Sequence, residues 1–131
     1  MPTIISKFKS LWKTDEREIV PVEGKALFSL VYKDLEIGTL MFEDGTWAFQ
    51  YSAAFKNQTE LKPLVDFPNL EKVYSFHELP PFFAHRIPGL GQPKVQKILS
   101  KENISEDNEV DLLKRFGKLS IANPFRLIVN Q

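Results

Sequence analysis

The sequence predicts a single α+β domain in which helices pack on one side of a small antiparallel sheet. Alternating and aromatic segments dominate up to about residue 80, helical spacing follows, and one more strand candidate lies near residue 129. Strands followed by helices and a last strand are typical of an α+β domain. The 131 residues, 43% of them hydrophobic and 26% charged, fit one soluble globular domain.

Residues 1–24 differ from the rest and are predicted to form an amphipathic N-terminal extension before the main domain at 25–131. Their apolar residues recur at helical spacing, at Ile4, Ile5, Phe8, Leu11 and Trp12. Three roles stay open for this extension. It packs on its own domain, it binds a partner protein through Phe8 and Trp12, or it lies on an anionic membrane surface.

Two strands with a turn between them are predicted at the start of the main domain. Lys25–Lys33 is apolar and aromatic enough for a buried strand, and Lys33 and Asp34 begin a turn before a second strand at Leu35–Phe42. Gly38 lies inside the second strand, where a glycine indicates a bulge or a close backbone contact.

A third strand completes the predicted meander. Asp44-Gly45 readily adopts the positive φ angles of a tight hairpin turn. After this turn Trp47, Phe49 and Tyr51 alternate with Thr46, Ala48 and Gln50, which is the period of a strand with one packed face. Residues 52–64 are expected to form a loop, and Leu64–Phe67 a short strand that Pro68 ends.

Three helices and a final strand are predicted in the second half. The first helix begins at Pro80 and Pro81, whose missing N–H groups cost little there, and runs to about Arg86. The second covers Pro93–Leu99, with Val95, Ile98 and Leu99 inward. The third is capped by Ser105 or Asp107, carries Val110, Leu113 and Phe116 on one face, and stops at Gly117. Phe125–Val129 is the final strand candidate.

Composition argues against several classes of protein. Seventeen basic and seventeen acidic residues cancel, whereas direct nucleic-acid binding usually brings a basic excess. The chain has no cysteine, so disulfides, thiol chemistry and cysteine-ligated metals are excluded. No apolar run approaches the ~18 residues of a membrane span, and Met1–Lys13 lacks the features of a signal peptide. We therefore expect a cytoplasmic protein with no membrane span.

No catalytic, metal or cofactor site is predicted. His77 and His85 do not fall at the spacing of metal ligands. Gly89–Lys94 lacks the spacing of a phosphate-binding loop, and Pro93 removes one backbone donor. No catalytic-loop or metal-loop motif of a kinase is recognisable. The carboxylates of Glu106, Asp107 and Glu109 are expected to form a solvated face.

Five short motifs follow one another between Leu27 and Val129. They are Val31-Tyr32 with Ile37-Gly38-Thr39-Leu40, then Gly45–Tyr51, Leu64–Pro68, Phe82–Pro88 and Asp111–Gly117. Together they resemble the N-terminal subdomain of HipA-like serine/threonine kinases, whose signatures include "FF-x-x-hydrophobic-hydrophobic-P" and "D-hydrophobic-L-L-x-x-hydrophobic-G". The sequence departs from that pattern at Gly89-Leu90-Gly91, where an acidic-glycine pair is common, and at Ile121–Pro124, where a Gly-Ala step is expected.

The resemblance implies a binding protein without enzymatic activity or a cofactor. In some systems of this kind a short HipT-like kinase toxin is accompanied by a separate HipS-like antitoxin that resembles the subdomain the kinase lacks. Because no kinase region follows Gln131 in this sequence, the resemblance implies a HipS-like antitoxin that neutralises a HipA/HipT-like kinase toxin. A ternary complex with a DNA-binding HipB-like antitoxin is also implied. The alternative is a non-inhibitory structural subunit that completes a split HipA-like kinase.

The loop between the first two helices is the expected partner-binding segment. It comprises Ile87, Pro88, Gly89, Leu90, Gly91 and Gln92. An apolar side chain such as Leu90, placed between two glycines in a loop bounded by prolines, can anchor an interface. The large aromatic residues Trp47, Phe49, Phe82 and Phe83 are expected in the core instead.

Overall fold

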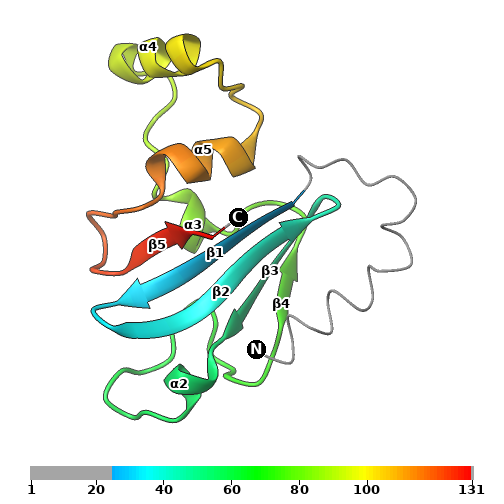
Figure 1. Cartoon of the computed structure of the whole chain (residues 1–131), viewed down its shortest axis with the longest axis vertical. Coiled ribbons are helices and arrows are strands. Elements are labelled where there is room, and N and C mark those ends of the chain that lie inside the picture. Colours follow the sequence, from blue (N-terminus) through cyan, green and yellow to red (C-terminus); the bar gives the residue numbers. More distant parts are fainter. Residues whose placement is uncertain (1–24, 131) are drawn as a thin grey trace.

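The computed structural model describes residues 25–130 and shows an α+β domain. Its five strands form one antiparallel sheet in the order β4-β3-β2-β1-β5, and Figure 1 shows α2 at one end of the molecule and α4 at the other. The elements are β1 (Lys25–Tyr32), β2 (Leu35–Glu43), β3 (Thr46–Tyr51), α2 (Ala53–Lys56), β4 (Tyr74–Phe76), α3 (Pro81–Ala84), α4 (Pro93–Glu102), α5 (Glu109–Phe116) and β5 (Arg126–Val129). No helix among the described residues is long and apolar enough to cross a bilayer. The predicted extension at 1–24 lies outside the described residues.

The meander of β1, β2 and β3 is confirmed, together with the two turns that make it. Lys33 turns the first hairpin at φ 55°, and Asp44 and Gly45 turn the second at φ 51° and 78°. In the second turn, positive φ at both central positions is the geometry that suits the twist of paired strands. The expected role of Gly38 is also confirmed, because a Cβ there would lie 2.4 Å from the backbone oxygen of Gln50. The β1–β2 register shifts beside it, with Leu30 opposite Gly38 and Val31 opposite Glu36.

One face of the sheet carries the core, and α2, α3 and α5 pack on that face, while α4 packs on α5. Phe28, Trp47, Phe49 and Phe83 are fully buried in one cluster with Leu113 of α5. The core positions predicted for Trp47, Phe49 and Phe83 are thus confirmed. Phe82 is half-buried and packs against the same cluster. The prediction that β3 buries only one face was wrong. Ala48 and Gln50 on its other face are 2% and 5% exposed, so both faces of β3 are buried.

The segment after β3 differs from its prediction. Residues 53–56 form the short helix α2, because the Ser52 side chain accepts a hydrogen bond from the Phe55 amide at 3.0 Å and caps it. Leu64–Phe67 is a turn and not a strand. Its backbone is bonded to the buried Tyr51 hydroxyl, which accepts from the Leu64 amide at 2.8 Å and donates to the Phe67 carbonyl. The fourth strand is instead β4, and it pairs with β3.

The helices lie where expected but with different ends. α3 ends at Ala84, so Arg86 lies beyond it. α4 extends to Glu102, three residues past the expected end, and Asn103 then takes the left-handed conformation at φ 57°. The cap of α5 is Asn108 and neither Ser105 nor Asp107, since the Asn108 side chain accepts from the Asp111 amide at 3.0 Å.

The buried face and the end of α5, and the final strand, agree with the sequence prediction. Val110 and Leu113 of α5 are buried and Phe116 is half-buried, while Leu112 is also buried on the side toward α4. Gly117 follows α5 as predicted, and a Cβ there would lie 2.5 Å from the Leu113 carbonyl oxygen. β5 pairs with β1 and returns the chain to the sheet.

Candidate partner-binding surface

The predicted partner-binding loop, residues 87–92, connects α3 to α4. Its backbone is ordered by the Ile87 amide, which donates to the Ala84 carbonyl at 3.0 Å, and by the Gln92 amide, which donates to Gly89 at 3.3 Å. Gly89, Gly91 and Gln92 are exposed, whereas Ile87, Pro88 and Leu90 are half-buried. The outward surface of the loop is therefore formed mainly by two glycines and a glutamine.

Leu90 lies closer to the body of the domain than a protruding tip would. It packs on a small cluster formed by Val95 and Leu99 of α4 with Leu112 of α5. Its carbonyl accepts a hydrogen bond from the Gln96 side chain, which also donates to Glu106 at 2.8 Å. The loop is thus tied to α4 by the packing of Leu90 and by Gln96, which also bonds Glu106 in the segment after the helix. Phe8 and Trp12, the other expected contact residues, lie outside the described residues.

Arg86, immediately before this loop, is a buried cation that the sequence reasoning did not single out. It is 5% exposed, and its guanidinium donates to the carbonyls of Gly117 at 2.9 Å and Phe125 at 2.8 Å. It also donates to the Asn123 side chain at 3.0 Å and, at 3.3 Å, to the Lys118 carbonyl. Arg86 therefore ties the α3–α4 loop to the segment that joins α5 to β5.

Burial lowers the pKa of Arg86 to about 10. A guanidinium with that pKa remains cationic at neutral pH, so its hydrogen bonds are charge-assisted and stronger than neutral ones. Its Nε is buried without a hydrogen-bond partner among the described residues. The signal that could have identified Arg86 is its place directly before Ile87 in the motif that begins Phe82-Phe83, where a charged side chain that turns inward needs buried acceptors.

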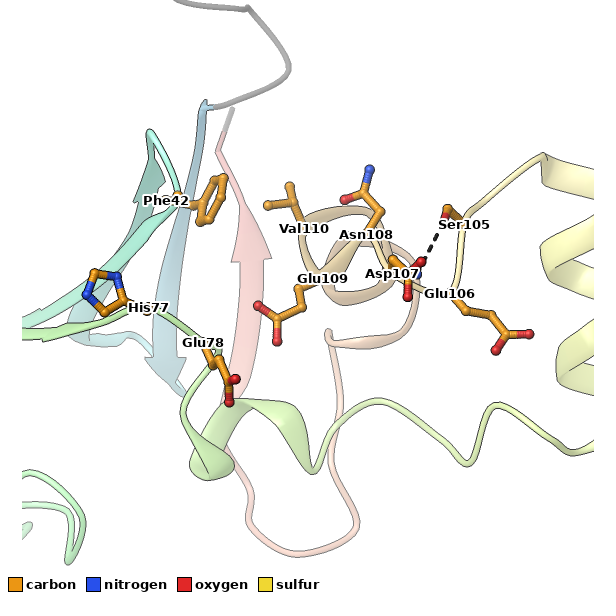
Figure 2. Close-up of a pocket in the computed structure, with 10 residues that line it drawn as sticks. Phe42, His77, Glu78, Ser105, Glu106, Asp107, Asn108, Glu109 and Val110 are labelled. Atoms are coloured by element: carbon orange, nitrogen blue, oxygen red, sulfur yellow. Dashed lines mark hydrogen bonds between the residues drawn. The ribbon is translucent and has the colours of Figure 1, made fainter.

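An open groove of about 660 Å³ lies beside the hairpin of β2 and β3. Figure 2 shows Phe42 and Val110 pointing toward each other in it, with Glu106 pointing away from them. The remaining lining residues are mostly polar or acidic and include His77, Glu78, Ser105, Asp107, Asn108 and Glu109. Within residues 25–130 no group of three or more histidine, aspartate or glutamate side chains is placed to hold a metal ion.

Glu109 is the one carboxylate of this groove whose predicted role was wrong. It was expected on a solvated face, but it is half-buried and accepts hydrogen bonds from the Trp47 indole at 3.0 Å and from the Leu79 amide at 3.1 Å. Trp47 itself is fully buried, so its N–H needs an acceptor inside the protein. Glu109 therefore joins α5 to the sheet and is not available to bind a ligand by itself.

Comparison with known proteins supports the family resemblance. The model of the HipA N-terminal domain family matches residues 29–121, which is more than half of the chain. No curated protein shows significant similarity to the chain. The matched region begins inside β1 and includes the rest of the meander, the Phe82–Pro88 motif, the 87–92 loop and α5. The chain belongs to the HipA N-terminal domain family.

Proposed function

We propose that this chain is the antitoxin of a HipBST-like toxin–antitoxin system, in which it binds and neutralises a HipA/HipT-like serine/threonine kinase. The observation that carries the proposal is the family match over residues 29–121. Because the family is defined by the N-terminal domain of HipA, we take a HipA-like kinase as the partner. The proposal gives the chain no chemistry of its own.

The shape of the domain supports binding as its mode of action. Its sheet shares one core with α2, α3 and α5, and α4 packs on α5 in a smaller cluster, so the described residues form a folded unit that can present a fixed surface. The 87–92 loop is held at both ends by backbone hydrogen bonds and by the packing of Leu90. A loop that is already ordered loses little conformational entropy when a partner binds it.

Docking inhibits the kinase in this proposal, because phosphoryl transfer requires the catalytic groups of the kinase to be correctly positioned. A protein kinase needs a lysine, a catalytic aspartate and metal-binding residues in register around ATP. We propose that the chain docks on the N-lobe of the kinase and that the 87–92 loop contacts it there. Docking then holds a kinase loop in an inactive position, or the 87–92 loop enters the active-site cleft.

Co-expression with the HipA/HipT-like kinase of the same genome tests the proposal. We expect expression of the kinase alone to arrest growth, and co-expression of the full chain to restore growth and to yield a stable complex on purification. A complex with unchanged or greater toxicity would instead indicate a structural subunit that supports the kinase. Absence of any complex would contradict the proposed function altogether.

A further inference from the structure

Two large apolar side chains are exposed in the loop that joins α5 to β5, residues 117–125. Leu119 is 64% exposed and Ile121 is fully exposed. Among the described residues only four large hydrophobic side chains are exposed, the other two being Val65 and Val129. In Figure 1 this loop turns back at the edge of the molecule between α5 and β5. Exposed apolar groups that gather in one segment indicate a contact surface more strongly than scattered ones.

The 117–125 loop is held in one conformation although it lacks a helix or strand of its own. Arg86 binds its two ends through the carbonyls of Gly117 and Phe125, as described above. The Leu127 amide donates to the Lys118 carbonyl at 3.0 Å, and the Asn123 side chain accepts from the Phe125 amide at 3.1 Å. Leu119 and Ile121 are therefore presented from a fixed backbone, which lowers the entropy cost of binding.

The charged side chains of this loop and of the residues that flank it in sequence have one sign. From Leu112 to Asn130 the sequence has Lys114, Arg115, Lys118 and Arg126 and no acidic side chain. Arg115 pairs with Glu102 at 2.8 Å, but within residues 25–130 no ion pair includes Lys114 or Lys118. A surface with two apolar side chains among free cations is complementary to an apolar pocket bordered by carboxylates.

We propose that the 117–125 loop is a second docking element, in which Leu119 and Ile121 enter an apolar pocket with an acidic rim on the partner kinase. This inference rests on the proposed function and adds to it a partner surface of stated chemistry. Arg86 then serves both docking elements, since it immediately precedes the 87–92 loop and hydrogen-bonds the 117–125 loop. The two loops form one bipartite contact surface.

Binding measurements with the full chain and the purified kinase test this inference. We expect Leu119→Asp and Ile121→Asp each to raise the Kd at least about tenfold, because each places a charge where an apolar anchor is buried. Lys118→Glu should lower the association rate and reduce its dependence on salt. Val65→Asp is the matched control: Val65 is 93% exposed in an ordered turn outside both docking elements, and we expect less than about a twofold change in Kd.

The outcomes separate this inference from the proposed function. If the wild-type chain binds the kinase and both aspartate variants bind with the wild-type Kd, the 117–125 loop is not a docking element and the antitoxin proposal stands. If the wild-type chain does not bind the kinase at all, both proposals fail. If Ile121→Asp abolishes self-association of the chain but leaves kinase binding unchanged, the loop is a contact between copies and the inference is wrong. Thermal unfolding of each variant confirms that the exposed substitutions leave the fold intact.

Discussion

At the scale of single residues, Arg86 and Tyr51 hold two loops in place from inside the protein. Arg86 supplies donors to the α5–β5 segment, and Tyr51 supplies both a donor and an acceptor to the turn at Leu64–Phe67. Each pairs backbone groups that no helix or strand satisfies, which is the condition under which a buried polar side chain is stabilising. Neither loop depends on its own sequence alone for its conformation.

Replacing Arg86 should be among the costliest single changes outside the apolar core. We expect Arg86→Met to lower the free energy of unfolding by about 2–4 kcal/mol, because it leaves buried carbonyl oxygens without donors. Urea denaturation of the variant measures this directly. Arg126→Met is the control, because Arg126 is exposed and makes one long bond of 3.3 Å to the Lys33 carbonyl. Equal losses in the two variants would contradict the role given to Arg86.

The buried hydroxyl of Tyr51 predicts a loss of stability at high pH. Burial raises the pKa of Tyr51 to about 12 from its ordinary value of 10.0. Between these values the unfolded chain releases this proton and the folded chain keeps it, so the free energy of unfolding falls as pH rises. We expect wild-type protein to lose more stability between about pH 8 and about pH 11 than Tyr51→Phe does. A parallel pH dependence in both proteins would show that Tyr51 is not the group responsible.

At the scale of elements, α5 depends on its first turn for both its start and its position. Asn108 caps the helix through the Asp111 amide, and Glu109, the first residue of α5, binds Trp47 and the Leu79 backbone. The cap sets where the helix begins, and Glu109 sets how it lies against the sheet. Val110 and Leu113 then reach the main core while Leu112 faces α4.

The identity of the α5 cap can be tested by three substitutions. We expect Asn108→Ala to lower the free energy of unfolding by about 1 kcal/mol, the usual cost of losing a capping side chain. Ser105→Ala and Asp107→Ala should change it by about 0.5 kcal/mol or less, since these exposed residues precede the cap. Chemical denaturation of all three variants decides between the cap positions. A larger loss for Ser105→Ala than for Asn108→Ala would mean that the helix begins earlier.

At the scale of the whole molecule, a formal net charge of zero conceals a separation of charge. Glu78, Glu106 and Asp107 gather at the groove beside the β2–β3 hairpin, whereas the segment from Leu112 to Asn130 carries only basic side chains. The 87–92 loop leads to α4, at the opposite end of the molecule from α2, and the 117–125 loop lies at the side of the molecule between α5 and β5 (Figure 1). A partner that contacts both loops would leave the α2 end free.

The position of the 87–92 loop can be tested by placing a large side chain on it. A Cβ at Gly91 would meet nothing within 4 Å, and its φ is not positive, so Gly91→Arg should leave the fold intact. We expect it to weaken kinase binding at least about tenfold by blocking the 87–92 loop. Ala54→Arg, on an exposed position of α2, is the matched control and should bind as wild type. Titration calorimetry compares the two variants, and unchanged binding by Gly91→Arg would remove the 87–92 loop from the interface.

Elements whose signals are local could be predicted from the sequence alone. Asp44-Gly45 and the alternation of Trp47, Phe49 and Tyr51 predicted the meander, because strand period and turn chemistry depend on neighbouring residues. Pro81 and Pro93 predicted the starts of two helices for the same reason. The family motifs added the fold and the expected partner, although the contact role of the 87–92 loop stays a prediction.

Features that depend on contacts between distant residues could be known only from the folded domain. The three-residue strand β4 forms because β3 offers it an edge, and the Leu64–Phe67 segment becomes a turn because Tyr51 satisfies its backbone. The half-burial of Leu90 and the bonds of Arg86 to residues 31 to 39 positions away have no local signature. Such features follow from packing and from the need to pair buried polar groups, which no short stretch of sequence specifies.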